Sequence, residues 1–396
     1  MNERIALLAN EYPPGPHGGI GSFTTDLAEG LAGKGCAVDV IVAQLGAPRR
    51  EPAQCRDEAS NPRVWDIALS SPRWMRWRPG AVWQRWQLRS ELRRLHRIRR
   101  FQLVECIDNS GLLPFGGIPG IPSVVRLHGA TFFYDAELGS MTSDRFTHWL
   151  EKRTLDSADH LVGVSRFVAE GEMRRAGKQR PADRVIYNAV DAEHAFRPDA
   201  SVSREDGLIV FANAIHPRKG VNELCAAMNG VMERFPNARL VLIGRIVAGD
   251  AERRETERAL VESVKPVHRA RITFTGGLSR IGVRDWIARA HLCCYPSKLE
   301  SFGLAPVEAM AMGKPTIYSR TGAGPEVIED GVSGLLCDPA DSADIAEKIC
   351  AILGDRELAE SLGANGRRRA VELFDRRQWI DRNLDFYRHC LQRVND

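Results

Sequence analysis

Residues 292–318 read LCCYPSKLESFGLAPVEAMAMGKPTIY and contain a strand pattern, a helix pattern and a second strand pattern in succession. The apolar runs 292–295 and 316–318 predict buried β-strands, and residues 306–312 predict a helix between them that Gly313 ends. Strands that alternate with helices indicate a parallel sheet covered on both faces. This stretch therefore predicts an α/β fold.

The same alternation extends over the whole chain. Further strands are predicted at 4–9, 38–43, 103–107, 123–127, 160–164, 184–187, 208–212, 239–243 and 271–275, and further helices at 22–32, 221–234 and 282–289. Because the pattern restarts near residue 208, we expect two doubly wound units, residues 1–195 and 196–375. A final amphipathic helix from residue 376 to 394 could pack on either unit.

Composition limits the class of protein. The chain has 396 residues, is 43% hydrophobic and carries a net charge of +4, which is typical of a globular protein and too even to indicate nucleic acid. No apolar run approaches the roughly 20 residues of a membrane span, and the charged N-terminus is unlike a signal peptide. The nine cysteines show no Cys-x-x-Cys spacing, so we expect no disulfides, no zinc site and a reducing cytoplasm.

The predicted helix start near Pro306 indicates an anion-binding site. Proline suits the first helical turn, where no N–H is needed. The amides around it are expected to be unpaired and to point at one spot: those of Phe302, Gly303, Leu304 and Ala305. Two carboxylates flank this spot, Glu300 before the helix and Glu308 in its first turn. The alternative is that a carboxylate here only stabilises the helix dipole.

Two cations follow the strand predicted at 208–212. Arg218 and Lys219 belong to the sequence His-Pro-Arg-Lys-Gly at 216–220, just before a predicted helix. In open α/β sheets, ligands bind at the carboxyl ends of the strands, so these cations are candidates for an anionic ligand. The alternative is a solvated basic turn.

Two weaker signals lie in the first half. His128 ends the strand predicted at 123–127, although a lone histidine is usually structural. The glycine-rich loop 13–21, which includes Gly19, would let the backbone approach a phosphate. Thr24 stands where the dinucleotide fingerprint has its third glycine, which disfavours a hydride-transfer enzyme.

The segment from Arg73 to Arg100 is rich in arginine and tryptophan and contains one acid, Glu91. One interpretation is a solvated helix whose tryptophans face the core. The other is a cationic, aromatic surface for an anionic membrane or a lipid acceptor. Nucleic acid is disfavoured because no recognised binding motif accompanies the segment.

The glutamate motif resembles the large family 4 of retaining glycosyltransferases, which have the GT-B fold. The resemblance rests first on Glu300-x7-Glu308, with Pro-Ser (296–297) before it and Gly-Ala-Gly-Pro-Glu (322–326) after it. Weaker matches follow the family's order along nearly the whole chain: Gly18-Gly19, Leu127-His128-Gly129, Val164-Ser165, Asn-Ala-Val-Asp (188–191) and Lys219-Gly220.

The resemblance implies two Rossmann-like domains that face a cleft, with a C-terminal helix, 376–396, that crosses back to the first domain. The first domain would bind a glycan or lipid-linked acceptor and the second a nucleotide-diphospho-sugar. It implies a cytoplasmic enzyme of polysaccharide or glycolipid synthesis, and the basic segment suggests a peripheral position at the inner membrane face.

The resemblance also implies roles for single residues. Glu308 would bind the ribose, Glu300 the transferred sugar, and Lys219 the diphosphate together with the amides at 303–305. From the first domain, Gly19 would approach the diphosphate and His128 would contact the sugar.

The chain departs from the family where Gly-Arg is usual before the lysine, because Asn213 and Ala214 stand there. Arg218 could supply the missing charge, or donor affinity could be lower. No Asp-x-Asp occurs, so no metal or cofactor is expected. Two alternatives stay open, a sugar-nucleotide epimerase or hydrolase of similar fold and a catalytically silent nucleotide-binding partner protein. The sequence does not fix the sugar, the base (UDP, GDP or ADP) or the oligomeric state.

Overall fold

The computed structural model describes residues 3–15, 18–72, 74–75, 78–246 and 250–392. Its internal contacts divide the chain into two compact units, Met1–Tyr187 with Arg377–Asp396, and Asn188–Arg376. The sequence pattern predicts a junction after residue 195, whereas residues 188–195 belong to the second unit. The reason is that Val190 pairs with Asp375 in a parallel bridge and its N–H donates to the carbonyl of Phe374 (2.9 Å).

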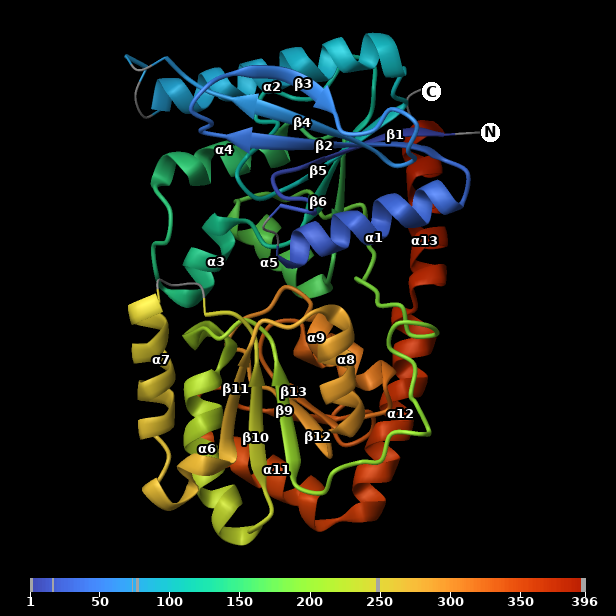
Figure 1. Cartoon of the computed structure of the whole chain (residues 1–396). Coiled ribbons are helices and arrows are strands. Elements are labelled where there is room, and N and C mark those ends of the chain that lie inside the picture. The colour runs from blue at the N-terminus through green and yellow to red at the C-terminus, as the bar shows by residue number, and fades with distance from the viewer. Residues whose placement is uncertain (1–2, 16–17, 73, 76–77, 247–249, 393–396) are drawn as a thin grey trace. The chain divides into compact units, whose positions relative to one another are not determined.

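The first unit is built on an eight-stranded sheet with the order β3-β4-β2-β1-β5-β6-β7-β8 (Figure 1). Strand β3 runs antiparallel to β4, and the other pairs of neighbouring strands in the described residues are parallel. The strand order reverses between β1 and β5, which is the point where open α/β sheets bind ligands. The strands are β1 (Arg4–Ala9), β2 (Ala37–Leu45), β3 (Glu51–Cys55), β4 (Arg63–Leu69), β5 (Leu103–Ile107), β6 (Ser123–Leu127), β7 (His160–Gly163) and β8 (Arg184–Val185).

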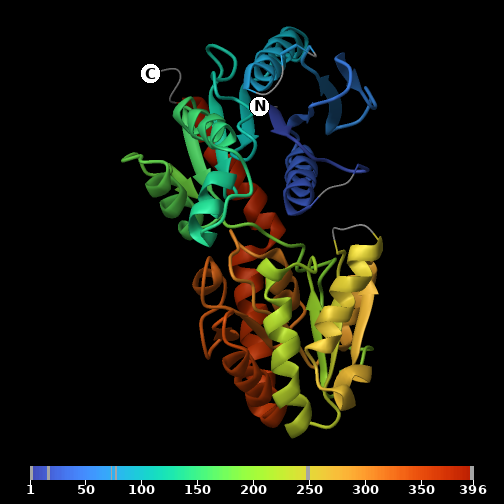
Figure 2. The same cartoon turned by 90° about the vertical axis from the view of Figure 1, so that its left-hand side faces the viewer.

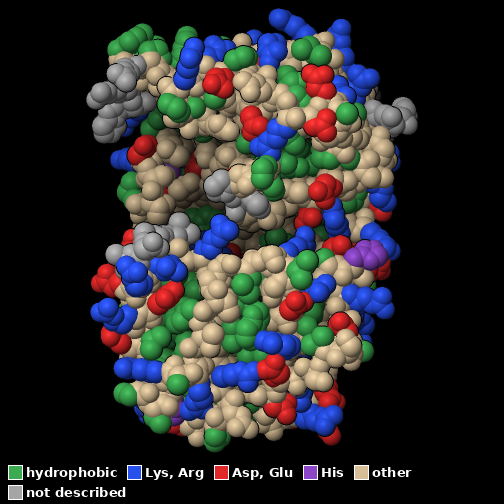
Figure 3. Space-filling view, viewed as in Figure 1, with side chains coloured by type: hydrophobic (Ala, Val, Ile, Leu, Met, Phe, Trp, Pro, Cys, Tyr) green, Lys and Arg blue, Asp and Glu red, His purple; other side chains and the backbone are tan. Residues whose placement is uncertain are grey.

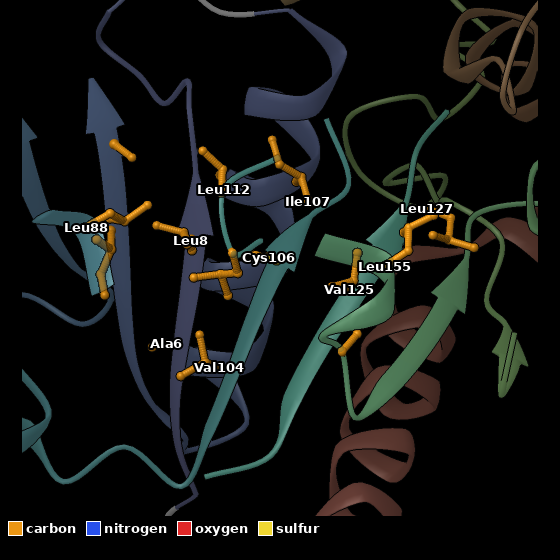
Figure 4. Packing of buried hydrophobic residues seen from close by; sticks show 14 of the residues in the cluster. Ala6, Leu8, Leu88, Val104, Cys106, Ile107, Leu112, Val125, Leu127 and Leu155 are labelled. Carbon is orange, nitrogen blue, oxygen red and sulfur yellow. The ribbon is translucent and has the colours of Figure 1, made fainter. Parts of the chain in front are cut away.

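Helices pack against this sheet and bury its apolar side chains. They are α1 (Gly19–Gly33), α2 (Arg78–Arg99), α3 (Thr131–Leu138), α4 (Arg145–Asp156) and α5 (Arg166–Arg175). Figure 4 shows part of the resulting core, in which Leu88 of α2 lies near Leu8 and Leu155 of α4 lies near Val125. The burial of both faces explains why these strands read as continuous apolar runs.

The second unit has a six-stranded, wholly parallel sheet with the order β11-β10-β9-β12-β13-β14. Its strand order reverses between β9 and β12. Figure 2 shows this unit from the side, with helices on both sides of the sheet. The strands are β9 (Leu208–Ala212), β10 (Arg239–Ile243), β11 (Ile272–Gly276), β12 (Leu292–Tyr295), β13 (Thr316–Ser319) and β14 (Leu335–Cys337). The helices and 3-10 turns are η1 (Pro217–Lys219), α6 (Val221–Arg234), α7 (Asp250–Glu262), η2 (Pro266–Arg271), α8 (Arg280–Arg289), α9 (Leu304–Ala311), α10 (Gly324–Val327), α11 (Ser342–Gly354) and α12 (Arg356–Phe374).

Helix α13 (Arg376–Gln392) returns to the first unit, as the resemblance implies. Its Asn383 and Tyr387 join a buried network with Arg126 of β6 and Glu105 of β5. Arg126 donates to Glu105 (2.7 and 2.9 Å) and to Asn383 (2.6 Å), and the Tyr387 hydroxyl donates to Glu105 (2.7 Å). Because these polar groups partner one another, the helix can bury them against the sheet.

Candidate active site

The point where the second sheet reverses its strand order carries the predicted lysine and the first predicted glutamate. Lys219 ends the turn η1 shortly after β9, and Glu300 follows β12. The Nζ of Lys219 donates a hydrogen bond to Oε1 of Glu300, and the two side chains are only 12% and 11% exposed. Residues far apart in sequence thus meet at the sheet edge where parallel α/β folds bind ligands.

Glu300 is held in its charged form. Burial by itself raises the pKa of its carboxyl, but Lys219, Arg218 and the Ser297 hydroxyl outweigh burial and lower the pKa below the ordinary value. Ser297 Oγ donates to Oε1 (3.2 Å), and a guanidinium nitrogen of Arg218 lies 4.0 Å from Oε2. An ionised carboxylate of this kind is a strong acceptor for hydroxyl groups.

Hydrogen bonds join the two loops that carry this pair. Arg218 donates from its guanidinium to the carbonyl of Leu299 (2.9 Å), and its own carbonyl accepts from the N–H of Lys298 (2.8 Å). Gly220 has φ +72°, and a Cβ there would lie 1.7 Å from the carbonyl oxygen of Pro296. Only glycine allows the two loops to approach this closely.

Helix α9 begins two residues earlier than the sequence predicts. Its first residue is Leu304 and its N-cap is Gly303, whose φ of +90° turns the chain into the helix before Pro306. No side chain of the described residues caps this helix end. Residues 303–305 are partly exposed, so their amides stay candidates for the predicted anion site.

Phe302 is predicted to contribute its amide, and Glu308 is predicted to lie in the first turn of the helix. The Phe302 side chain is buried against Phe374, and its carbonyl accepts a hydrogen bond from the Tyr318 hydroxyl (3.0 Å), so it offers the site backbone only. Glu308 does not lie in the first turn of α9, because the early start places it four residues after Leu304, one turn further in. It is partly exposed on the same helix face as Leu304.

A further cation, missed in the sequence, follows β10. Arg245 is exposed, and its carbonyl accepts from the N–H of Ile215 (3.1 Å), directly after Ala214. It forms no ion pair with a carboxylate of the described residues. The sequence did carry a signal for it. Asn213 and Ala214 depart from the family motif just after β9, and Arg245 follows β10, the neighbouring strand in the sheet.

The glycine-rich loop of the first unit is closed by a carboxylate that sequence reasoning missed. Glu11 Oε1 accepts hydrogen bonds from the N–H groups of Gly18 (3.1 Å) and Gly21 (2.7 Å) and so caps α1. A Cβ on Gly19 would meet nothing within 4 Å. Contacts of Gly19 within the described residues thus do not require glycine. Pro16 and His17 of this loop lie outside the described residues.

His128 follows β6 and is 7% exposed. Its ring lies edge-on to Phe23 of α1, with centroids 4.6 Å apart. Its backbone N–H donates to Asp108 (2.8 Å). Burial, with a smaller effect of Arg126, lowers the pKa of His128 to about 3, so its ring is neutral at pH 7. A neutral imidazole can donate or accept a hydrogen bond but cannot serve as a fixed cation.

The described tryptophans in and just before helix α2 are exposed to solvent. Trp83 and Trp86 are 41% and 50% exposed, and Trp74, just before the helix, is 78% exposed, so the interpretation in which they face the core is wrong for them. The buried face instead contains Leu88, Leu92 and Leu95. Figure 3 shows Lys and Arg side chains along the upper rim, where Figure 1 places α2. Arg73, Arg76 and Trp77 lie outside the described residues.

The predicted site residues thus fall into two groups. Lys219, Arg218 and Glu300 are in contact, and the start of α9 belongs to the same unit. Gly19 and His128 belong to the first unit. Across the described ranges, no group of three or more His, Cys, Asp or Glu side chains is arranged to hold a metal ion. No helix in those ranges is both long and apolar enough to cross a membrane.

Two family models match consecutive parts of the chain. The model described as "Glycosyltransferase Family 4" matches residues 17–194, and "Glycosyl transferases group 1" matches residues 194–369. Among curated proteins, an uncharacterised glycosyltransferase of Methanocaldococcus jannaschii is 25% identical over 94% of each chain. Alpha-maltose-1-phosphate synthase of Mycolicibacterium smegmatis is 26% identical over 97% of this chain and 99% of its own.

Solved structures support the fold. Sucrose-phosphate synthase of Thermosynechococcus elongatus superposes with a TM-score of 0.79 at 24% identity, over 98% of this chain and 99% of that one. HepE of Anabaena, in complex with UDP and glucose, gives a TM-score of 0.75 at 18% identity, over 98% and 100%.

The chain has two α/β units with mainly parallel sheets, a helix that returns to the first unit and a lysine–glutamate pair at the sheet edge of the second. Together with the comparisons, these features define a glycosyltransferase of the GT-B fold. The chain belongs to the group 1 glycosyltransferases, of family 4.

Proposed function

We propose that the protein is a retaining glycosyltransferase that transfers a sugar from a nucleotide-diphospho-sugar to a hydroxyl of a glycan or lipid-linked acceptor, without a metal ion. The observation that carries the proposal is the Lys219–Glu300 pair beside the uncapped start of α9. A relative in fold, HepE of Anabaena, is known in complex with UDP-glucose, which supports this class of donor.

The charges suggest how the reaction proceeds. As the bond from the anomeric carbon to the diphosphate breaks, negative charge grows on the leaving oxygen. Lys219 and the amides of residues 303–305 would stabilise that charge, an effect of several kcal/mol in preorganised sites. The acceptor hydroxyl attacks from the face that the diphosphate leaves, its oxygen bonds to the anomeric carbon, and its proton passes to the diphosphate.

In this proposal the other site residues position the donor. Glu300 accepts hydrogen bonds from the hydroxyls of the transferred sugar, and Glu308 accepts them from the ribose. Arg218 adds positive charge near the diphosphate. From the first unit, the neutral His128 ring contacts the sugar and Gly19 approaches the diphosphate. Glu300 is not a nucleophile, and a glycosyl adduct trapped on it would contradict the retaining mechanism proposed.

We also propose that the enzyme works in the cytoplasm at the inner membrane face, in polysaccharide or glycolipid synthesis. The supporting observation is the exposed aromatic and basic surface of residues 74–100, formed in its described part by Trp74, Trp83, Trp86, Arg97 and Arg100. Tryptophan and arginine side chains together favour the interface of anionic bilayers.

A thermal-shift panel with UDP, GDP and ADP tests the donor class. A ligand present at 100 times its Kd stabilises the native protein by about 2.7 kcal/mol, which a melting curve resolves. We expect one of the three to stabilise the wild type and to stabilise Lys219→Ala less. Product analysis with the matching nucleotide-sugar then separates the alternatives. An epimerase converts the donor without an acceptor, and a silent partner protein converts nothing.

A further inference from the structure

Three carboxyl groups are fully buried beneath the loop that carries His128. Asp108 follows β5 directly, Glu151 belongs to α4 and Glu172 to α5, and each is 0% exposed. None of them has a role in the proposed reaction. Buried acids persist in folded proteins only where other groups satisfy them, so their partners indicate what they do.

Asp108 accepts hydrogen bonds from backbone N–H groups of two segments, its own loop after β5 and the loop after β6. Its Oδ2 accepts hydrogen bonds from the N–H groups of His128 (2.8 Å) and Gly129 (2.9 Å). Its Oδ1 accepts from the N–H of Asn109 (2.8 Å). Both oxygens of Asp108 are therefore acceptors, and the turn that orients His128 is fixed directly by this side chain.

The other two carboxyls fix the rest of the same loops. Glu151 Oε1 accepts from the N–H groups of Ser110 (3.1 Å) and Thr131 (3.2 Å), and its Oε2 accepts from that of Phe132 (3.0 Å). Glu172 Oε2 accepts from the N–H of Ala130 (3.5 Å). Residues 108–111 and 128–132 are thus tied together by Asp108 itself and by side chains from α4 and α5.

Asp108 and Glu172 accept hydrogen bonds from the consecutive N–H groups of Gly129 and Ala130, so the two carboxyls are near enough for a hydrogen bond between them. Two carboxyl groups can form such a bond only when one of them holds a proton. Asp108 already accepts with both oxygens, whereas Glu172 Oε1 has no donor among the described residues. The proton therefore belongs on Glu172.

We propose that Glu172 stays protonated at neutral pH and donates to Asp108, and that this shared proton holds the His128 loop in place. Asp108 and Glu172 are then positioning residues for His128. This arrangement of Glu172, Asp108 and His128 does not depend on the proposed function. Only its effect on sugar transfer rests on that function.

The surrounding charges agree with this assignment. Burial raises the pKa of both Asp108 and Glu172, and repulsion between carboxylates, including Glu151, raises it further. The nearest buried cation on α2, Arg85, donates to the carbonyls of Ser110 and Gly111, and the other, Arg126, is paired with Glu105. When pH rises past these raised pKa values, the proton is lost and two carboxylates face each other beside His128.

The test is an NMR pH titration of the intact chain labelled with [13C]histidine, in which His128→Gln assigns the His128 Cε1–H signal. The His128 ring stays neutral from about pH 6 to about pH 10, because its pKa lies near 3, so a change in its signal reports its surroundings and not its own protonation. We expect the wild-type signal to shift as the pH rises from about 8 to about 10, above the raised pKa of Asp108, which is about 7. We expect no such shift in Glu172→Gln, because the amide donates to Asp108 at every pH and still accepts from Ala130.

Glu170→Gln, an exposed position on the same helix, is the matched control and should titrate like the wild type. A wild-type signal that does not move, or a shift that persists unchanged in Glu172→Gln, would overturn the proposal. So would failure of Glu172→Gln to fold by circular dichroism, since the amide retains every hydrogen bond. UDP, GDP and ADP binding is measured separately, so a protein that binds none of them leaves this test intact.

Discussion

Lys219 and Glu300, 81 residues apart in the chain, form an ion pair in which each side chain is nearly nine-tenths buried. The proposed function assigns these two residues to different parts of one donor molecule. A bound donor would then exchange the direct contact for contacts with its diphosphate and its sugar. The pair keeps both side chains oriented toward the same spot before any ligand arrives, which lowers the entropic cost of binding.

Replacing Lys219 by alanine should weaken binding of the nucleoside diphosphate at least tenfold. A charge-assisted hydrogen bond contributes roughly 1.5–3 kcal/mol, and tenfold corresponds to about 1.4 kcal/mol. Isothermal titration with the nucleotide found by the thermal-shift panel measures the change. Lys298→Ala is the control, because Lys298 lies in the loop that carries Glu300 but pairs with Glu223. Equal affinity of Lys219→Ala and the control would remove the lysine from the donor site.

Glu300→Gln should destabilise the second unit at neutral pH by on the order of 1–3 kcal/mol, because the ion pair with Lys219 is lost. The pKa of Glu300 is lowered, so its contribution is present above the ordinary value of 4.5 and is lost as pH falls through the lowered pKa. The stability difference between wild type and variant should therefore shrink below about pH 4.5. Urea unfolding at several pH values measures it. A difference that is the same at every pH would contradict the pairing.

Gly220→Ala should destabilise the protein and weaken nucleotide binding together. The left-handed backbone alone costs a non-glycine residue roughly 1–2 kcal/mol, and the new Cβ would also displace the Pro296 loop that leads to Glu300. Gly230→Ala in the adjoining helix α6 is the control. Its Cβ would make only an ordinary 4.0 Å contact with Ala346, so a gain of about 0.5–1 kcal/mol is expected. Thermal melts and nucleotide titrations of both variants decide the matter, and a Gly220→Ala protein of wild-type stability would refute the close approach.

Replacing both Trp74 and Trp83 by alanine should reduce binding to anionic liposomes by about tenfold or more, since each indole contributes over 1 kcal/mol when it leaves water. Co-sedimentation with vesicles that contain an anionic lipid measures binding, and added salt should weaken it further. Ile281→Ala is the control, because Ile281 is 64% exposed on α8 of the second unit. Unchanged co-sedimentation of the double variant would exclude this surface as the membrane contact.

Much of the fold could be predicted from the sequence because parallel strands buried on both faces leave continuous apolar runs. The strands at 103–107, 123–127, 208–212 and 239–243 have the predicted bounds. The antiparallel strand β3 was missed, since its sequence, EPAQC, is largely exposed and has no apolar run.

The site was predictable only where local motifs carry it. Lys219 and Glu300 belong to short motifs at strand ends, so their meeting follows from topology. The start of α9 was misplaced because Pro306 dominated the pattern, while the left-handed Gly303 fixes the true start. The buried acids Glu151 and Glu172 lie on helices whose patterns give no sign that their carboxyls reach loops about 40 residues away.

The return of α13 to the first unit also bears on how the chain is made. Arg126 donates to Asn383, which lies 257 residues later in the chain. Helix α13 therefore cannot cover the Arg126–Glu105 ion pair until the entire second unit has been synthesised. The first unit therefore cannot complete its fold before the second unit has been synthesised. A fragment that stops before α13 would leave the Arg126–Glu105 ion pair without its partners Asn383 and Tyr387, so we expect its first unit to be less stable than that of the intact chain.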